Sequence, residues 1–130
     1  MELAVEDGLL AICRLPPAAP LPAWATRAQR FLTVSRTREE LSITLDAEVV
    51  PPDVACARGY RALRVRGPLD FDLVGVLASL AGPLAQAGIS IFNISTYDTD
   101  YVLVKTGDLA RAVAALERAG HRVQGFDPGE

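Results

Sequence analysis

The chain has 130 residues, half of them apolar, enough for one compact domain or two very small ones that fold without disulfides or structural metals. Its formal net charge is -3 and it has no run of Lys or Arg, which argues against binding to the phosphate backbone of nucleic acids. The first residues are acidic and the apolar run that follows is short, so we expect neither a signal peptide nor a membrane segment, and a cytosolic location.

The two cysteines, Cys13 and Cys56, are far apart and show no CxxC spacing. Cys13 lies inside an apolar segment. This pattern predicts buried, reduced thiols in preference to a disulfide or a redox pair.

The first half of the chain is rich in loops. An apolar strand is expected over 9–15, and a helical turn over 24–28. The prolines between them exclude regular structure; they are Pro16, Pro17, Pro20 and Pro22. We expect this segment to be a surface loop anchored by Trp24.

Two further strands are predicted over 31–35 and 41–45, joined by a polar turn. In the second strand every other residue is apolar, so we expect its other face to point to water. The segment 53–59, which follows two prolines, is the candidate link between the two halves of the chain.

The second half is more regular. A strand over 60–66 precedes a helix that Asp70 or Asp72 can cap and that Gly88 ends. Its apolar residues have the spacing of one buried stripe; they are Leu73, Leu77, Leu80 and Leu84. Pro83 lies inside this helix, and we expect it to cause a kink.

Strands over 89–95 and 101–105 follow, and then a helix capped by Asp108, whose buried face is Leu109, Val113 and Leu116. A short strand over 121–124 ends the series. The order βαββαβ predicts an α+β, ferredoxin-like fold, with an antiparallel sheet and the helices on one face.

The two halves show a weak internal repeat. Ser35, Glu40, Leu41 and Ile43 stand sixty residues before Ser95, Asp100, Tyr101 and Leu103. We therefore expect two copies of one unit, a degenerate half over 1–58 and a complete domain over 59–130.

The most distinctive segment runs from Gly88 to Lys105. Between its two apolar strands it places six consecutive side chains that can form hydrogen bonds, from Ser95 to Asp100. Asp and Thr close turns through their own backbone, so ordinary turn chemistry is one explanation and a ligand-facing role is the other.

This segment and the one before it resemble an ACT domain, the small regulatory module that binds amino acids in enzymes such as aspartate kinase. The resemblance rests on GPLDFDLVGVLASLAGPLAQAG at 67–88 and on ISIFNISTYDTDYVLVK at 89–105. Together with ELSITL in the first half, they resemble the tandem ACT proteins found as short bacterial chains and in the cytosolic arginine sensor.

The resemblance implies an allosteric protein that binds an amino acid where two ACT units meet. By position, the ligand would contact two segments. The loop before the first helix contributes Asp70, Phe71 and Asp72, and the turn between the strands contributes Thr96, Tyr97 and Asp100. Because the first unit is short, the site is expected to need a second chain, which implies a homodimer.

The residues themselves are compatible with this implication. A zwitterion needs an anion for its ammonium group, such as Asp100 or Asp72, and N–H donors for its carboxylate, such as those at the start of the helix near Leu73 to Gly75. Ser95, in the same run of polar residues, is a further candidate contact. Gly75 would also allow a ligand to approach the backbone closely. The alternative is that the two acidic residues before the helix only cap it.

No catalytic residues, metal ligands or cofactor are predicted. The one histidine, His121, follows a helix and is expected to be structural, and no HExxH, GxSxG or Gly-rich phosphate motif is present. The principal alternative to a sensor is a structural dimerisation module without a ligand, and a degenerate enzyme is a weaker one.

Overall fold

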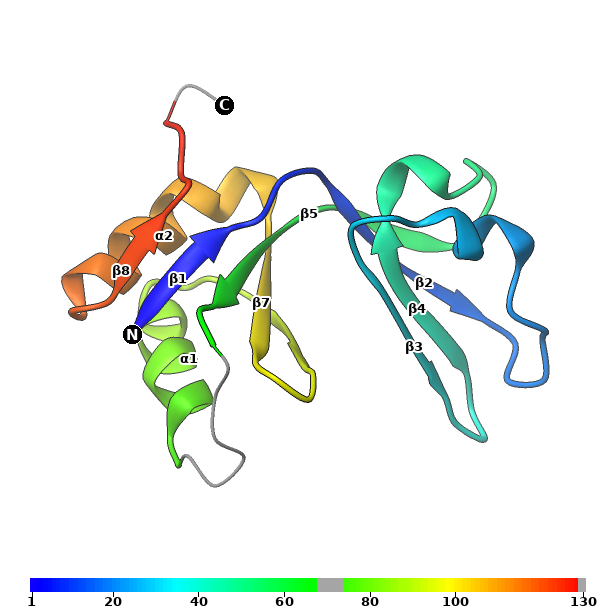
Figure 1. Ribbon diagram of the computed structural model, residues 1–130, viewed down its shortest axis with the longest axis horizontal. Coiled ribbons are helices and arrows are strands. Elements are labelled where there is room, and N and C mark those ends of the chain that lie inside the picture. The colour runs from blue at the N-terminus through cyan, green and yellow to red at the C-terminus, as the bar shows by residue number, and fades with distance from the viewer. Residues whose placement is uncertain (68–73, 129–130) are drawn as a thin grey trace. The chain divides into compact units, whose positions relative to one another are not determined.

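The computed structural model of the chain describes residues 1–67 and 74–128 (Figure 1). Those residues form β-strands, two α-helices and three short 3-10 helices. In chain order the α-helices and strands are β1 (Glu2–Val5), β2 (Leu10–Leu15), β3 (Leu32–Arg36), β4 (Leu41–Asp46), β5 (Cys56–Val65), α1 (Val76–Gln86), β6 (Phe92–Ser95), β7 (Asp100–Lys105), α2 (Leu109–Arg118) and β8 (Arg122–Gln124).

The chain divides into two compact units. The larger contains Met1–Asp7 and Arg61–Glu130, and the smaller contains Gly8–Tyr60. The ten-residue strand β5 belongs to both, because the boundary falls between Tyr60 and Arg61. The segment predicted as a link, 53–59, therefore includes the beginning of a strand.

The larger unit has the predicted order, β5-α1-β6-β7-α2-β8, with β1 as an additional strand that the sequence did not reveal. The strands are arranged β6-β7-β5-β1-β8. β1 pairs antiparallel with β5, with Leu3 opposite Val65, and parallel with β8, with Leu3 opposite Val123. The α+β, ferredoxin-like fold is confirmed. Among the pairs β1–β5, β1–β8 and β6–β7, only β1–β8 is parallel.

Both helices cover the same face of this sheet. Residues at alternate positions of the strands pack against the apolar faces of α1 and α2 in one core. The strand residues are Leu3, Val5, Leu63, Val65, Val102 and Val104, and the helix residues include Leu80, Leu84, Leu109, Val113 and Leu116.

The start of α1 differs from the prediction. The helix begins at Val76, after Gly75, which has a φ of 83° and caps the helix without a side chain. Leu80 and Leu84 are fully buried as predicted, but Leu77 is 41% exposed, and Val76 packs against the core instead. With 3.6 residues per turn, a helix that buries Val76, Leu80 and Leu84 turns Leu77 away from the sheet. Leu73, Asp70 and Asp72 lie outside the described residues.

The helix α1 stays helical on both sides of Pro83. Pro83 has no N–H, so it leaves the carbonyl of Ser79 without its helical donor. Nε2 of His121 lies 2.9 Å from that carbonyl oxygen, and Nδ1 of the same ring lies 3.0 Å from the amino group of Met1. His121 is thus structural: its ring contacts α1, and its backbone N–H donates to the carbonyl of Leu116 in the last turn of α2 at 3.0 Å.

The predicted cap of α2 is wrong. Asp108 precedes the helix but makes no cap hydrogen bond, and its carboxylate instead accepts a hydrogen bond from Arg111 Nη1 at 2.9 Å. Arg111 also donates through Nη2 to the carbonyl of Ala87 at 2.6 Å. The acidic residue therefore positions an arginine that ties α2 to the end of α1.

The smaller unit arranges its strands β3-β4-β2-β5 and contains no α-helix. Its core lies under two 3-10 helices, Ala23–Arg27 and Ala47–Val49, and includes Leu41, Ile43 and Leu45, with Trp24 partly buried against it. Thr44, predicted to face water, is only 2% exposed. Thr44 lies opposite Ile12 on β2 and Thr33 on β3, so side chains on the same face of both neighbouring strands flank it.

The prediction of reduced thiols is wrong, because Cys13 and Cys56 form a disulfide. They lie opposite each other on the adjacent antiparallel strands β2 and β5, with Cα atoms 4.2 Å apart. Only the pairing of strands 43 residues apart in sequence brings them together. A crosslink of this span adds about 2–4 kcal/mol by restricting the unfolded chain.

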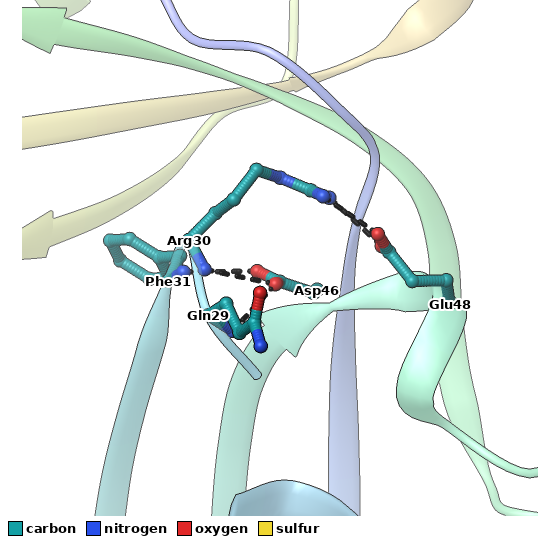
Figure 2. Close-up of polar contacts among 5 residues, drawn as sticks. All are labelled: Gln29, Arg30, Phe31, Asp46 and Glu48. Carbon is teal, nitrogen blue, oxygen red and sulfur yellow. Dashed lines mark hydrogen bonds and ion pairs between the residues drawn. The ribbon is translucent and has the colours of Figure 1, made fainter. Parts of the chain in front are cut away.

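A buried carboxylate holds the entrance to β3 (Figure 2). Asp46 is 2% exposed and accepts hydrogen bonds from the backbone N–H groups of Gln29, Arg30 and Phe31 at 2.9 to 3.0 Å. Beside it, the Arg30 guanidinium donates to both carboxylate oxygens of Glu48, at 2.6 and 2.8 Å. This hydrogen bonding lowers the pKa of Glu48 to about 2.

The pKa of Glu48 generates a prediction for acid stability. Because the pKa in the folded protein is below the usual 4.5, the pair stabilises the fold above about pH 4.5, and this contribution is lost as the pH falls towards 2. Glu48→Gln should lower the urea midpoint near neutral pH, and the difference from the parent protein should vanish near pH 2. Glu39→Gln, another exposed carboxylate of the smaller unit, is the control. A deficit in Glu48→Gln that is the same at both pH values would contradict this origin.

The bond from His121 to Ser79 can be tested by a double-mutant cycle. His121→Phe should cost about 1 kcal/mol of unfolding free energy, because the Ser79 carbonyl loses its donor. Pro83→Ala restores a backbone N–H that can take the place of that donor. Urea denaturation is measured for the parent, the two single variants and the double variant. The loss of unfolding free energy caused by His121→Phe should be smaller in the Pro83→Ala background. Strictly additive losses would show that the bond does not contribute to stability.

Candidate functional site

The hairpin formed by β6 and β7 carries most of the predicted site. Ser95, the last residue of β6, lies opposite Asp100, the first of β7. Between them the backbone N–H of Thr96 donates to the carbonyl of Thr99 at 2.8 Å, and the N–H of Thr99 lies 3.3 Å from the Thr96 hydroxyl. The turn is therefore closed by its own two threonines.

Thr99 also ties the turn to the centre of the sheet. Its side chain is buried, and its hydroxyl donates to the carbonyl of Val65, the last residue of β5, at 2.6 Å. The chain continues from β5 towards α1, so the turn and the start of α1 lie at the same end of this unit (Figure 1). Part of the hydroxyl-rich segment is consequently structural, as turn chemistry alone would require.

On the face that the helices cover, three polar side chains form a hydrogen-bonded series. The Ser95 hydroxyl donates to Oδ1 of Asp100, and Nδ2 of Asn93 lies 3.4 Å from the Ser95 hydroxyl. Register places these residues on the same face as Val102 and Val104. Oδ1 of Asn93 is buried and has no hydrogen-bond partner among the described residues, so together with the Asp100 carboxylate it can accept hydrogen bonds from a cation.

The nearby end of α1 can supply the opposite charge preference. Gly75 is the residue directly before the helix, and it makes no side-chain cap. It therefore accepts no hydrogen bond through a side chain from the N–H groups of the first turn. The positive end of the helix dipole and these N–H groups attract anions. A Cβ placed on Gly75 would meet no atom within 4 Å, so its hydrogen side chain is required by its positive φ and not by crowding.

The opposite face of the same hairpin borders a pocket of about 250 Å³. Its lining residues, all polar except one glycine, come from β5 and the residues just after it, the hairpin turn and β7: Arg64, Gly67, Thr96, Asp98, Thr99 and Tyr101. Burial, the largest cause, raises the pKa of the Tyr101 phenol; the Glu6 and Asp98 carboxylates raise it further, and Arg64 opposes them.

The structure thus separates the residues predicted from sequence. Ser95 and Asp100 are in contact, Gly75 lies at the start of α1, and Thr96 lines the pocket on the other face. Tyr97 is 79% exposed at the tip of the turn. The remaining candidates lie outside the described residues: Asp70, Phe71 and Asp72.

Sequence reasoning missed Asn93 and the residues that line the pocket, apart from Thr96. Asn93 could have been found, because it stands two positions before Ser95 and strand residues at that spacing share a face. Arg64 and Tyr101 are brought to one pocket by the pairing of β5 with β7, for which the sequence carries no local signal.

Two negative observations concern the described residues only. Residues 1–67 and 74–128 contain no group of three His, Cys, Asp or Glu side chains placed to hold a metal ion. Over the same ranges, no helix combines the length and the hydropathy that crossing a membrane requires.

Family models and relatives agree with this architecture. A model of the ACT domain matches residues 55–118, and a second model, of an N-terminal domain, matches residues 8–53. Subunit 1 of the cytosolic arginine sensor for mTORC1 from mouse is 33% identical over 106 residues, and the human protein is 35% identical over 96 residues. These matches cover 75% and 68% of this chain but only 32% and 29% of the sensors, so the chain spans about a third of their length.

Solved structures extend the comparison. The Agrobacterium tumefaciens protein Atu0741 is 35% identical with a TM-score of 0.89, and the match covers 97% of this chain and 93% of that one. The regulatory subunit of aspartate kinase from Thermus thermophilus has a TM-score of 0.64 at 14% identity, covering 91% and 97%, which is a likeness of fold. The ACT model, these relatives and the βαββαβ unit show that the chain belongs to the ACT-domain family.

Proposed function

We propose that this chain is a cytosolic regulatory protein that binds an amino acid and has no catalytic activity. The observation that carries the proposal is the position of Asp100. Its carboxylate accepts a hydrogen bond from Ser95 on the helix-covered face, at the end of the sheet where α1 begins without a side-chain cap.

This arrangement suits the two charged groups of an amino acid. The ammonium group would bind the Asp100 carboxylate, with Oδ1 of Asn93 as a further acceptor. The carboxylate would bind the N–H groups at the start of α1, where the helix dipole is favourable. The loop residues Asp70, Phe71 and Asp72 remain proposed contacts by their position in the family pattern.

The relatives support this class of ligand. One group of relatives is named for sensing arginine, and a structural neighbour is the regulatory subunit of aspartate kinase. The chain covers only a third of the sensors, so arginine itself is not carried over. The name of these sensors also supports a cytosolic location for this chain. In the cytosol the Cys13–Cys56 disulfide would be exposed to reduction, because that compartment keeps most thiols reduced.

We further propose that the site is completed by a second chain in a homodimer. We also propose that the chain contains two copies of one unit, a degenerate ACT-like half over 1–58 and an ACT domain over 59–130. In favour of association, β3 lies at the edge of its sheet, and Leu32 and Val34 on it are 42% and 40% exposed. The same feature would serve a structural dimerisation module without a ligand, which is the competing function.

A thermal-shift screen against the twenty common amino acids separates the two functions. A ligand at a hundred times its dissociation constant adds about 2.7 kcal/mol, which raises the melting temperature by several degrees. Asp100→Asn should weaken binding of the active amino acid roughly tenfold or more, because it removes a charged hydrogen bond. Glu117→Gln, an exposed carboxylate on α2, should leave it unchanged.

Each other outcome is informative. If no amino acid raises the melting temperature, the regulatory function is wrong and the structural module is favoured. If one does and Asp100→Asn binds it as well as the parent protein does, the ligand lies elsewhere on the chain.

A further inference from the structure

We propose that the pocket bordered by Arg64, Asp98 and Tyr101 is a second small-molecule site, which takes a compact zwitterion. It is distinct from the site proposed at Asp100 and does not depend on it. Asn93, Ser95 and Asp100, which form the first site, do not line the pocket, whereas Thr96, a candidate for the first site from its sequence position, does.

The two sites lie on opposite faces of one hairpin. Successive strand residues point to opposite faces, so Tyr101 faces away from the side of Asp100 and Val102. Arg64 likewise lies between Leu63 and Val65, which both point into the helix-covered core. The pocket is therefore on the side of the sheet that the unit's helices do not cover.

The charges in the pocket favour a ligand with both signs. Nε of Arg64 is paired with Glu6 Oε1 at 2.9 Å, and its terminal nitrogens make no hydrogen bond with any described residue. A guanidinium with terminal N–H donors remaining can bind a carboxylate in a forked geometry. The Asp98 carboxylate, on the turn, likewise makes no hydrogen bond within the part of the chain that the structure describes, and it can bind an ammonium group.

A simple anion fits this pocket less well. The Arg64 charge is already offset by Glu6, and Asp98 adds a further negative charge, so a lone carboxylate would meet a net negative surrounding. A lone ammonium group would find Asp98 but would leave the Arg64 donors unused. A molecule that carries both groups, such as an α-amino acid, can use the Arg64 donors and the Asp98 carboxylate together.

The remaining walls limit the size of the ligand. A volume of about 250 Å³ accommodates a small α-amino acid or a similar zwitterion. The hydroxyls of Thr96 and Thr99 are engaged in closing the turn and in binding the Val65 carbonyl, so they shape the pocket and are not its principal donors. The Tyr101 phenol, whose pKa is raised, stays protonated near neutral pH.

The test is a titration of ¹⁵N-labelled protein with glycine, followed by amide chemical shifts. It is carried out in the Asp100→Asn background, so that binding at the first site is weakened. We expect saturable shifts at Gly67, Thr99 and Tyr101, and at least tenfold weaker binding when either Arg64→Gln or Asp98→Asn is added. Arg66→Gln, two residues along, is the matched control and should bind glycine unchanged, because Arg66 pairs with Gln124 and does not line the pocket.

Acetate and methylammonium, titrated separately, should each bind at least tenfold more weakly than glycine. Acetate binding as tightly as glycine would overturn the zwitterion assignment. Glycine shifts that are absent, or that persist unchanged in both pocket variants, would overturn the site. Asp98 is exposed on the turn, so its variant keeps the test valid if Arg64→Gln, which also removes the pair with Glu6, fails to fold.

Discussion

The strand β5 is the element on which both units depend. Its first residues pair with β2 in the smaller unit, where Cys56 is bonded to Cys13, and its last residues pair with β1 in the larger. At its end the Val65 carbonyl accepts the hydroxyl hydrogen of Thr99. That bond holds the hairpin turn at the end of β5 from which the chain leads to α1.

The hairpin gives one sequence segment two chemical environments. Because side chains alternate along a strand, Ser95 and Asp100 belong to the helix-covered face, whereas Tyr101 belongs to the other. On the first face, a carboxylate and an amide oxygen lie near the start of a helix. On the second, an arginine and an aspartate border a small pocket. The density of polar residues in this turn is thus explained partly by turn closure and partly by the two surfaces that we propose as ligand sites.

Several backbone groups are satisfied by residues distant in sequence. The carbonyl that Pro83 leaves without a donor is bound by His121, and the carbonyl of Ala87 at the end of α1 is bound by Arg111. The Asp46 carboxylate accepts hydrogen bonds from three consecutive backbone N–H groups before β3. In each case a side chain distant in sequence supplies the hydrogen-bond partner that the local backbone lacks, because an unpaired backbone group costs free energy wherever it lies in the chain.

The sequence by itself determined the order of the elements, the ferredoxin-like fold of the second half and the family. Alternation and helical spacing are local properties, and they correctly placed the strands β2 to β4 and the apolar face of α2. The extra strand β1, the disulfide and the pocket at Arg64 were decided only by the tertiary structure. Each of them joins residues far apart in the chain, and the pairing of strands that brings them together is set by the packing of a whole sheet and leaves no mark within a single segment.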